Sequence, residues 1–253
     1  MGDILCHERV IFMGMRKFHT AGCTAALKCA AATLWAYGWE YDASAKVLLL
    51  PVPSFDPDGM IKGGGRLEDI LTPDTVVIGG NLHADTLAPC RCIDLLNDPQ
   101  YVAENAAITA HCALKYILSN LPATVYDSTF LIVGWGRIGK CLAKLLRSMG
   151  GAVTVYARKD ADRAMLTALG YDTLPSLDTD LSGYGVVINT APVMLLPKGR
   201  LTCRQLKIDL ASKPGIEGDD VIWARFLPGK DAPESSGKLI ARTVDRLGKE
   251  FLL

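Results

Sequence analysis

A glycine-rich turn between an apolar strand and an amphipathic helix limits most strongly what this chain can fold into. The apolar run 130–133 precedes the turn, and apolar residues at helical spacing follow it. In such a unit the first glycine allows a tight turn, the second lets the backbone approach a pyrophosphate, and the third lets the helix pack against the strand. The N-terminus of the helix then faces the anion. We therefore predict a dinucleotide-binding turn, with nucleotide contacts at Gly134, Trp135, Gly136, Arg137, Ile138 and Gly139.

The residues after the next predicted strand bear on which nucleotide is bound. Ala157 ends that strand, and Arg158 and Lys159 stand where an NAD site usually carries Asp or Glu for the ribose 2′-hydroxyl. A guanidinium and an ammonium group suit a 2′-phosphate instead. We expect these three residues to contact NADP(H). NAD(H) stays the alternative, because Asp160 follows directly.

The composition favours a globular protein that binds a small molecule. With 253 residues, 49% of them hydrophobic, the chain can bury a sizeable core and form two modest domains. Its 27 Lys and Arg offset its 27 Asp and Glu, and no basic tract occurs. We therefore expect neither nucleic acid nor an anionic membrane as a partner.

The cysteines and the apolar segments favour a cytoplasmic protein without a metal site. Cys90 and Cys92 form the only close pair among eight cysteines, and neither a second pair nor a nearby His completes a zinc site. We expect reduced thiols, since the chain is large and starts without a signal peptide. The apolar segment 23–39 is shorter than the ~20 apolar residues that span a bilayer and contains Lys28, so we predict a buried helix.

The order of the predicted elements indicates an α/β fold with two Rossmann-like domains. Residues 1–104 would form a smaller N-terminal α/β domain, and residues 105–233 a dinucleotide-binding domain with a doubly wound parallel sheet. The C-terminal helix, within 234–253, would pack back on the first domain, with Ser235 or Ser236 as its N-cap. The predicted strands are 9–13, 46–50, 75–78, 130–133, 152–157, 185–189, 206–210 and 221–226. The predicted helices are 20–37, 105–118, 160–169, 201–203 and 235–251.

Strand ends and turn-rich loops supply further candidate ligand residues. Ligands of doubly wound sheets lie beyond the carboxyl ends of the strands. We therefore expect the run Asn189, Thr190, Ala191 and Pro192 to contact the nicotinamide ribose or amide, although a capped turn would use the same residue types. In the first domain, the loops 51–59 and 63–65 are either ligand loops or plain surface turns.

Several separate stretches resemble one family in order and spacing. They are Asn105–Thr109, the glycine turn, Ala157 and Arg158, Asn189–Pro192, Asp209–Gly215, Leu227–Gly229, and Ala232 with Pro233. The chain resembles the A subunit of dipicolinate synthase from about residue 46 to its C-terminus, and the run Asp209–Gly215 is the most specific part. The resemblance implies a two-domain protein of the formate and glycerate dehydrogenase type. It also implies a flavoprotein-like B subunit as partner in spore-forming bacteria, and homo-oligomers stay open.

The activity that this resemblance implies is oxidation of a hydroxytetrahydrodipicolinate-type cyclic dicarboxylate to pyridine-2,6-dicarboxylate. Two positions depart from the family. His111 stands in a stretch where the family has a carboxylate, which alters any acid–base role there, and Ile216 replaces a glycine after the specific run. The identity of the substrate is therefore less firmly indicated than that of the cofactor.

The residue types that this chemistry needs are present. Lys213 and Ser212 can hold a carboxylate after an apolar strand. The proton acceptor would be His111, because a free imidazole titrates near neutrality, with Thr109 beside it and His83 as a weaker candidate. The further residues expected at the substrate are Ser54, Arg66, Asn81 and Asn105.

Two other functions fit parts of the sequence. A D-2-hydroxyacid dehydrogenase shares the architecture, but its catalytic His comes late in the chain, and here none follows His111. A non-catalytic NAD(P)-binding sensor or scaffold subunit would keep the glycine turn and have no use for substrate cations. Substitution of Lys213 distinguishes this second alternative from an enzyme.

Overall fold

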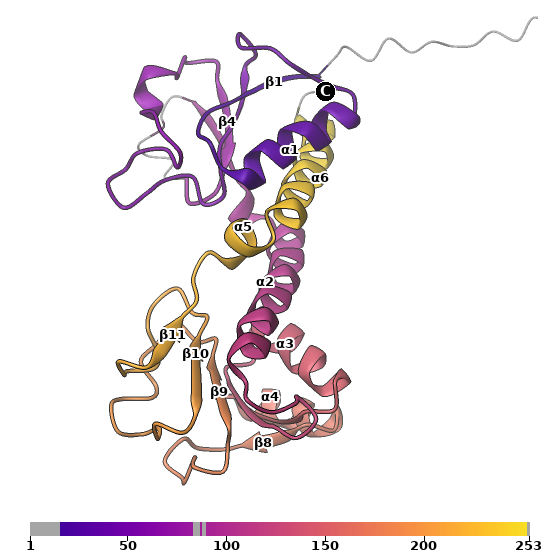
Figure 1. Cartoon of the computed structure of the whole chain (residues 1–253). Coiled ribbons are helices and arrows are strands. Elements are labelled where there is room, and N and C mark those ends of the chain that lie inside the picture. Colours follow the sequence, from indigo (N-terminus) through magenta and orange to yellow (C-terminus); the bar gives the residue numbers. More distant parts are fainter. Residues whose placement is uncertain (1–15, 83–86, 88–89, 252–253) are drawn as a thin grey trace, which may run out of the picture. The chain divides into compact units, whose positions relative to one another are not determined.

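The computed structural model describes residues 16–82, 87 and 90–251, and these form two compact units (Figure 1). The first unit contains the described residues up to Leu96 and those from Ile240 onward, and the second spans Asn97–Leu239. The predicted strand at 9–13 and the candidate His83 lie outside the described residues.

The first unit is built on a parallel five-stranded sheet in the order β2-β1-β3-β4-β5. The strands are β1 (Arg16–Thr20), β2 (Trp39–Tyr41), β3 (Val47–Leu49), β4 (Val76–Gly79) and β5 (Arg91–Asp94). Sequence patterning predicts β3 and β4, which are apolar and mostly buried. It misses β1, β2 and β5, because these short strands mix polar and apolar residues.

Helices α1 (Ala25–Ala36) and α6 (Pro233–Phe251) accompany this part of the chain, with 3₁₀ turns at Leu67–Asp69 and Leu95–Asn97. Asp245 of α6 accepts hydrogen bonds from Arg16 Nη1 at 2.8 Å and Trp39 Nε1 at 3.0 Å, so the C-terminal helix contacts the first unit. Burial raises the pKa of Asp245, but the bonds from Trp39 and Lys249 and the charge of Arg16 outweigh it and lower the pKa. The predicted N-cap at Ser235 or Ser236 is wrong, because the helix already starts at Pro233.

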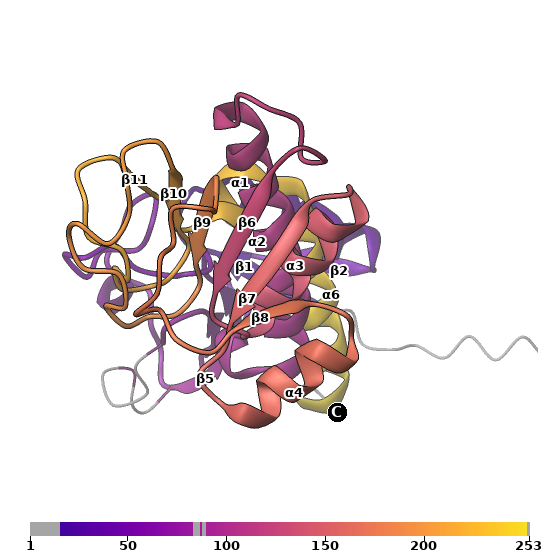
Figure 2. The same ribbon diagram turned by 90° about the horizontal axis from the view of Figure 1, so that it is seen from below.

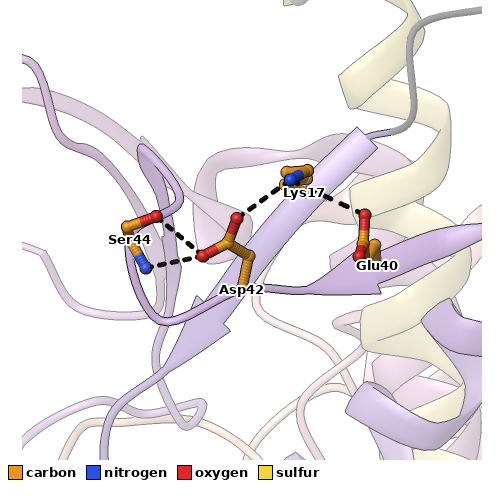
Figure 3. A network of polar contacts seen from close by, with 4 residues as sticks. All are labelled: Lys17, Glu40, Asp42 and Ser44. Carbon is orange, nitrogen blue, oxygen red and sulfur yellow. Dashed lines mark hydrogen bonds and ion pairs between the residues drawn. The ribbon is translucent and has the colours of Figure 1, made fainter.

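A polar cluster closes the turn after β2 at the edge of the first sheet (Figure 3). Ser44 donates to Asp42 Oδ1 from its backbone N–H at 2.9 Å and its hydroxyl at 2.7 Å, and Lys17 Nζ donates to Oδ2 at 3.0 Å. The bonds from Ser44, together with Lys17, hold the pKa of Asp42 well below its usual range. Glu40 lies 3.7 Å from the same ammonium group.

The second unit carries a parallel six-stranded sheet in the order β11-β10-β9-β6-β7-β8, and Figure 2 shows the strands in that sequence across the sheet. The strands are β6 (Thr129–Val133), β7 (Ala152–Tyr156), β8 (Asp172–Leu174), β9 (Val186–Asn189), β10 (Leu206–Asp209) and β11 (Val221–Trp223). Strand order reverses between β6 and β9, which is the doubly wound arrangement and its ligand-binding switch point. The predicted α/β fold with a doubly wound cofactor sheet is confirmed.

The helices of this unit are α2 (Pro99–Asn120), α3 (Arg137–Ser148), α4 (Asp160–Ala168) and α5 (Leu227–Asp231), together with the start of α6. Helix α2 starts earlier than predicted, because Asp98 caps it by accepting a 2.7 Å hydrogen bond from Tyr101 N. The predicted helix at 201–203 is wrong, since these residues form a turn. There the Thr202 N–H donates to the Gln205 side chain at 2.7 Å, so a side chain takes up a backbone donor and favours the turn.

Strand β6 is the centre of the second core. Its residues Phe130–Val133 are fully buried. Phe130 and Ile132 belong to one apolar cluster with residues of α2 and α3, whereas Leu131 and Val133 belong to another with Leu177, Leu181 and Leu196. Both faces of the strand are thus covered, which explains its unbroken apolar run. Within the described ranges no helix has the length and hydrophobicity to cross a bilayer.

Candidate nucleotide-binding site

The three glycines of the turn after β6 have different structural roles. Gly134 has φ of 108°, where a side chain is strained, and a Cβ there would lie 2.6 Å from Thr190 Oγ1. A Cβ on Gly139 would overlap the Gly134 carbonyl oxygen. A Cβ on Gly136 would meet nothing within 4 Å. The first and third glycines therefore serve the fold, and the second leaves open space at the N-terminus of α3.

Thr190, just beyond β9, fixes this turn. Its backbone N–H donates to Val133 O at 2.9 Å, and its hydroxyl lies within hydrogen-bond distance of Val133 O and Gly134 O at 3.1 and 3.3 Å. Gly134 N donates in turn to Tyr156 O at 2.9 Å. Three strand ends are therefore held together around the turn, which pre-organises the carboxyl edge of the sheet.

A cavity of about 390 Å³ lies at this edge. Trp135 lines it, and the indole packs edge-on against Tyr171 with a centroid distance of 5.7 Å, while Lys140 lies over the same ring. The indole is therefore a wall of the cavity and leaves it open. The sequence-predicted nucleotide residues that line it are Gly134, Trp135, Gly136, Ala157, Arg158, Lys159, Thr190, Ala191 and Pro192.

One end of this cavity is basic. Arg158 and Lys159 are exposed, and in the part of the chain that the structure describes neither forms an ion pair with a carboxylate. Asp160, the residue that keeps NAD(H) open, is paired with Arg163, which also donates to Ala157 O at 2.7 Å. Asp162, which was not predicted from the sequence, also lines the cavity, from the first turn of α4. The spacing of two residues between Asp160 and Asp162 could have indicated it, because residues two positions apart lie on different sides of a helix.

A second cavity of about 180 Å³ adjoins the same turn and shares Gly136 and Thr190 with the larger one. Arg137 and Ile138 of α3 line it, and Asn105 and Thr109 line it from α2. The two α2 residues lie one turn apart, and the Thr109 hydroxyl donates to Asn105 O at 2.8 Å. The cavities thus give a long ligand a path over the N-terminus of α3.

His111 lies elsewhere on α2. Its side chain is exposed, whereas Thr109 is buried at the smaller cavity. Residues two positions apart point to different sides of a helix. The structure therefore separates the candidate proton acceptor from the other predicted residues of α2.

Asn189 is buried and is used by the protein itself. Its Nδ2 donates to Ala191 O and to Asp209 Oδ1, both at 2.9 Å, and its Oδ1 accepts from Ala191 N. Asp209, which sequence analysis did not single out, accepts on Oδ2 from Gly215 N at 2.7 Å and Ile216 N at 3.0 Å. The pair shapes the loops after β9 and β10, and both polar atoms of the Asn189 side chain have partners within the protein.

The loop that Asp209 holds carries Ser212 and Lys213, which are both exposed. Asp209 Oδ1 accepts from Ala211 N at 3.0 Å, and Trp223 Nε1 donates to Ala211 O at 3.1 Å. The backbone before and after these two residues is thereby fixed. Their side chains are presented at the carboxyl end of β10.

In the first unit, Arg66 and Asn81 line a cavity of about 610 Å³. Carboxylates of Asp56, Asp58 and Glu68 line it as well. Ser54 is buried, and its hydroxyl donates to Pro51 O and accepts from Gly80 N, both at 2.9 Å. The structure thus brings two of the predicted substrate residues to one cavity and gives Ser54 a bond within its own loop.

Comparison with known proteins agrees with this geometry. Residues 105–202 match the NAD binding domain of the D-isomer specific 2-hydroxyacid dehydrogenases. That stretch contains most of α2, the glycine turn and strands β6 to β9. The match supports a nicotinamide cofactor and the chemistry of an oxidoreductase.

Most of the chain resembles a subunit of dipicolinate synthase. It is 28% identical over 231 residues to the A subunit of dipicolinate synthase from Bacillus subtilis (strain 168), which covers 81% of this chain and 78% of that protein. The solved A subunit of the Bacillus halodurans dipicolinate synthase has a TM-score of 0.81 and 19% identity, over 92% of this chain and 99% of that one. The Bacillus subtilis structure has a TM-score of 0.78 and 20% identity, over 94% and 96%. The resemblance indicated by the sequence is confirmed, and the structures show the shared fold.

Proposed function

We propose that this chain is an oxidoreductase similar to the dipicolinate synthase A subunit, which dehydrogenates a hydroxytetrahydrodipicolinate-type cyclic dicarboxylate with a nicotinamide nucleotide. The pair of cavities that meet at Gly136 and Thr190 carries the proposal. The larger one suits the adenosine half of a dinucleotide, and the smaller one, which reaches Asn105 and Thr109, suits the nicotinamide half. The similarity to the dipicolinate synthase protein supports the substrate class.

The basic end of the larger cavity favours NADP(H) over NAD(H). Arg158 and Lys159 are exposed there, and the nearest acid in sequence, Asp160, is paired with Arg163. A 2′-phosphate would take charge-assisted hydrogen bonds from both cations. Such bonds contribute roughly 1.5–3 kcal/mol each, which is more than the ribose hydroxyl of NAD would gain from them.

The chemistry assigns roles to the loop after β10. Conversion of the proposed substrate to pyridine-2,6-dicarboxylate requires loss of one water, and then of a hydride and a proton as the ring becomes aromatic. A bound nicotinamide supplies the hydride acceptor. Lys213 and Ser212 are exposed at the carboxyl end of β10 and would hold a carboxylate of the ring. We do not assign the departing proton to His111, because its side chain lies away from the smaller cavity.

The relative named above is, by its name, part of a synthase with more than one kind of subunit. We therefore propose a second, flavoprotein-like protein as the partner of this chain. The test is to incubate the purified protein with NADP⁺ or NAD⁺ and fresh hydroxytetrahydrodipicolinate, with and without that partner. We expect reduced nicotinamide and pyridine-2,6-dicarboxylate to form in equal amounts. Nucleotide binding without product in every combination would instead identify a sensor or scaffold subunit.

Three variants test the assigned roles. Lys213→Ala should abolish turnover with little change in NADPH affinity, whereas a sensor would be unaffected by it.

Removing both cations, Arg158→Ala with Lys159→Ala, should weaken NADPH binding about 10- to 100-fold and leave NADH binding within about threefold. Calorimetry measures both affinities. A loss of NADH affinity in Asp160→Asn would show that the acid binds the ribose and that the NADP assignment is wrong.

A further inference from the structure

The loop after β11 holds an arginine between two exposed aromatic rings. The guanidinium carbon of Arg225 lies 4.7 Å from the ring centroids of both Trp223 and Phe226. Rings on a guanidinium cover its faces, and its N–H groups point outward in the plane of the group. Across the described ranges no carboxylate forms an ion pair with Arg225. The two rings therefore hold the Arg225 side chain in place, and its N–H groups can donate hydrogen bonds to another molecule.

Phe226 adopts a backbone conformation that a bulky residue rarely takes. Its φ of 56° and ψ of 29° lie in the left-handed region, and it stands directly before α5. Such a conformation is strained and persists where the surroundings over-determine it, often at ligand clamps. The buried Leu227 anchors the next residue. The strained position places the second ring against Arg225.

The same edge of the sheet carries Lys213. Strands β10 and β11 are parallel, with Asp209 beside Trp223, so the loops that follow leave from the same end. Trp223 Nε1 donates to Ala211 O at 3.1 Å and ties the ring beside Arg225 to the loop of Lys213. Two cations therefore lie on neighbouring strand ends, at the edge where sheets of this type bind ligands.

We propose that Arg225 binds one carboxylate of the substrate and product, and that the loop of Lys213 binds the other. This inference rests on the proposed function, because it needs a ligand with two carboxylates. A guanidinium offers two parallel N–H groups to one carboxylate, whereas the lysine ammonium acts as a point charge. Arg225 would thus select for a dicarboxylate over a monocarboxylate, and the adjoining rings would face the planar pyridine ring.

The experiment compares binding of pyridine-2,6-dicarboxylate and pyridine-2-carboxylate to the NADPH-bound protein by calorimetry. In Arg225→Gln we expect the dicarboxylate to bind about 10- to 100-fold more weakly, the monocarboxylate to change little, and the preference for two carboxylates to disappear. Arg225→Lys should recover part of the affinity. Affinity for NADPH, measured on the same samples, shows that the fold is intact.

Arg204→Gln is the matched control. Arg204 is exposed and precedes β10, so it lies at the opposite, amino end of the strand. This variant should bind both ligands as the wild type does. If Arg225→Gln keeps the wild-type preference, the inference fails and the proposed function stands. If the wild-type protein binds neither pyridine acid, the proposed substrate class fails and this inference fails with it.

Discussion

Side chains at the carboxyl edge of the second sheet fall into two groups by burial. Asn189 and Asp209 are buried, and all their polar atoms bond to neighbouring loops. Arg158, Lys159 and Lys213 are exposed. The first group decides the shape of the loops, and the second is left for a ligand. A substitution in the first group should therefore act on stability, and one in the second on affinity.

Asp209 gives the clearest stability effect. Its two oxygens accept four hydrogen bonds from Asn189, Ala211, Gly215 and Ile216. In Asp209→Asn an NH₂ group replaces one acceptor and faces two donors, so we expect the free energy of unfolding to fall by about 2–4 kcal/mol. Urea denaturation measures this change. Asp219→Asn, on an exposed position of the same loop, is the control and should change it by less than about 0.5 kcal/mol.

His19 makes stability depend on pH. Both its ring nitrogens are buried, and neither has a partner within hydrogen-bond distance in the described chain. Burial lowers the pKa of His19 from 6.5, and this outweighs the Ala45 backbone and the negative charge of Asp42, which raise it. Below pH 6.5 the unfolded chain therefore binds a proton at His19 that the folded chain binds only at lower pH. We expect stability to fall as pH drops below about 6.5, with a slope of at most about 1.4 kcal/mol per pH unit.

Unfolding midpoints between pH 5 and 8 test this effect. In His19→Leu the slope between pH 6.5 and 5 should flatten, because the uncharged side chain binds no proton in either state. His111→Gln, on the exposed side of α2, should keep the wild-type slope. An unchanged slope in His19→Leu would assign the pH dependence to other groups.

The sequence indicated the cavity-lining residues that follow from recurring backbone geometry and missed those that depend on packing. The glycine turn, Arg158 and Thr190 follow from the order strand, turn and helix. Asp209 lies in the run Asp209–Gly215, the most specific part of the family resemblance. Only the structure shows that four groups donate hydrogen bonds to its carboxylate. Arg225 has no motif at all, because its order comes from two rings that the backbone brings to it.

At the scale of elements, the strand β6, the glycine turn and helix α3 act as one unit. The fold needs glycine where a Cβ would strike backbone or strain φ, as at Gly139 and Gly134. The proposed dinucleotide would need glycine where the fold does not, at Gly136. The two needs can be separated by substitution.

We expect Gly136→Ala to fold with a stability within about 0.5 kcal/mol of the wild type, since its φ of −78° is ordinary and the added Cβ meets no atom. NADPH should bind at least about 10-fold more weakly, because the methyl group occupies the approach of the pyrophosphate. Gly139→Ala is the matched comparison and should lose about 1–3 kcal/mol of stability through overlap with Gly134 O. Equal NADPH affinity in Gly136→Ala and wild type would contradict the assigned binding turn.

Elements were predictable where one pattern dominated. Buried parallel strands such as β6 and β9 are apolar runs in the sequence, and long helices are periodic ones. Strands β1 and β2 were not predictable, since the exposed Lys17 and the half-buried Glu40 form an ion pair there and interrupt the apolar pattern. The turn at 201–203 resembles a helix only until its side-chain hydrogen bonds are known.

At the scale of the whole molecule, each unit has its own parallel sheet and its own cavities. The order of predicted elements indicated two α/β parts, because strands and helices alternate in both. The predicted domain bounds, after residues 104 and 233, stay a prediction, and the compact units divide after Leu96 and Leu239. Helix α2 starts at a cap that lies outside the resembling stretches, and α6 begins in one unit and ends in the other.

The course of α6 has a consequence for biosynthesis. The first unit takes its last segment from Ile240 onward, and Asp245 in that segment bonds to Arg16 and Trp39 near the start of the described chain. A ribosome releases those two residues long before it makes their partner. The second unit, which is continuous in sequence, therefore needs no residue after Leu239 to complete its fold, whereas the first cannot complete its contacts until the residues from Ile240 onward have been made.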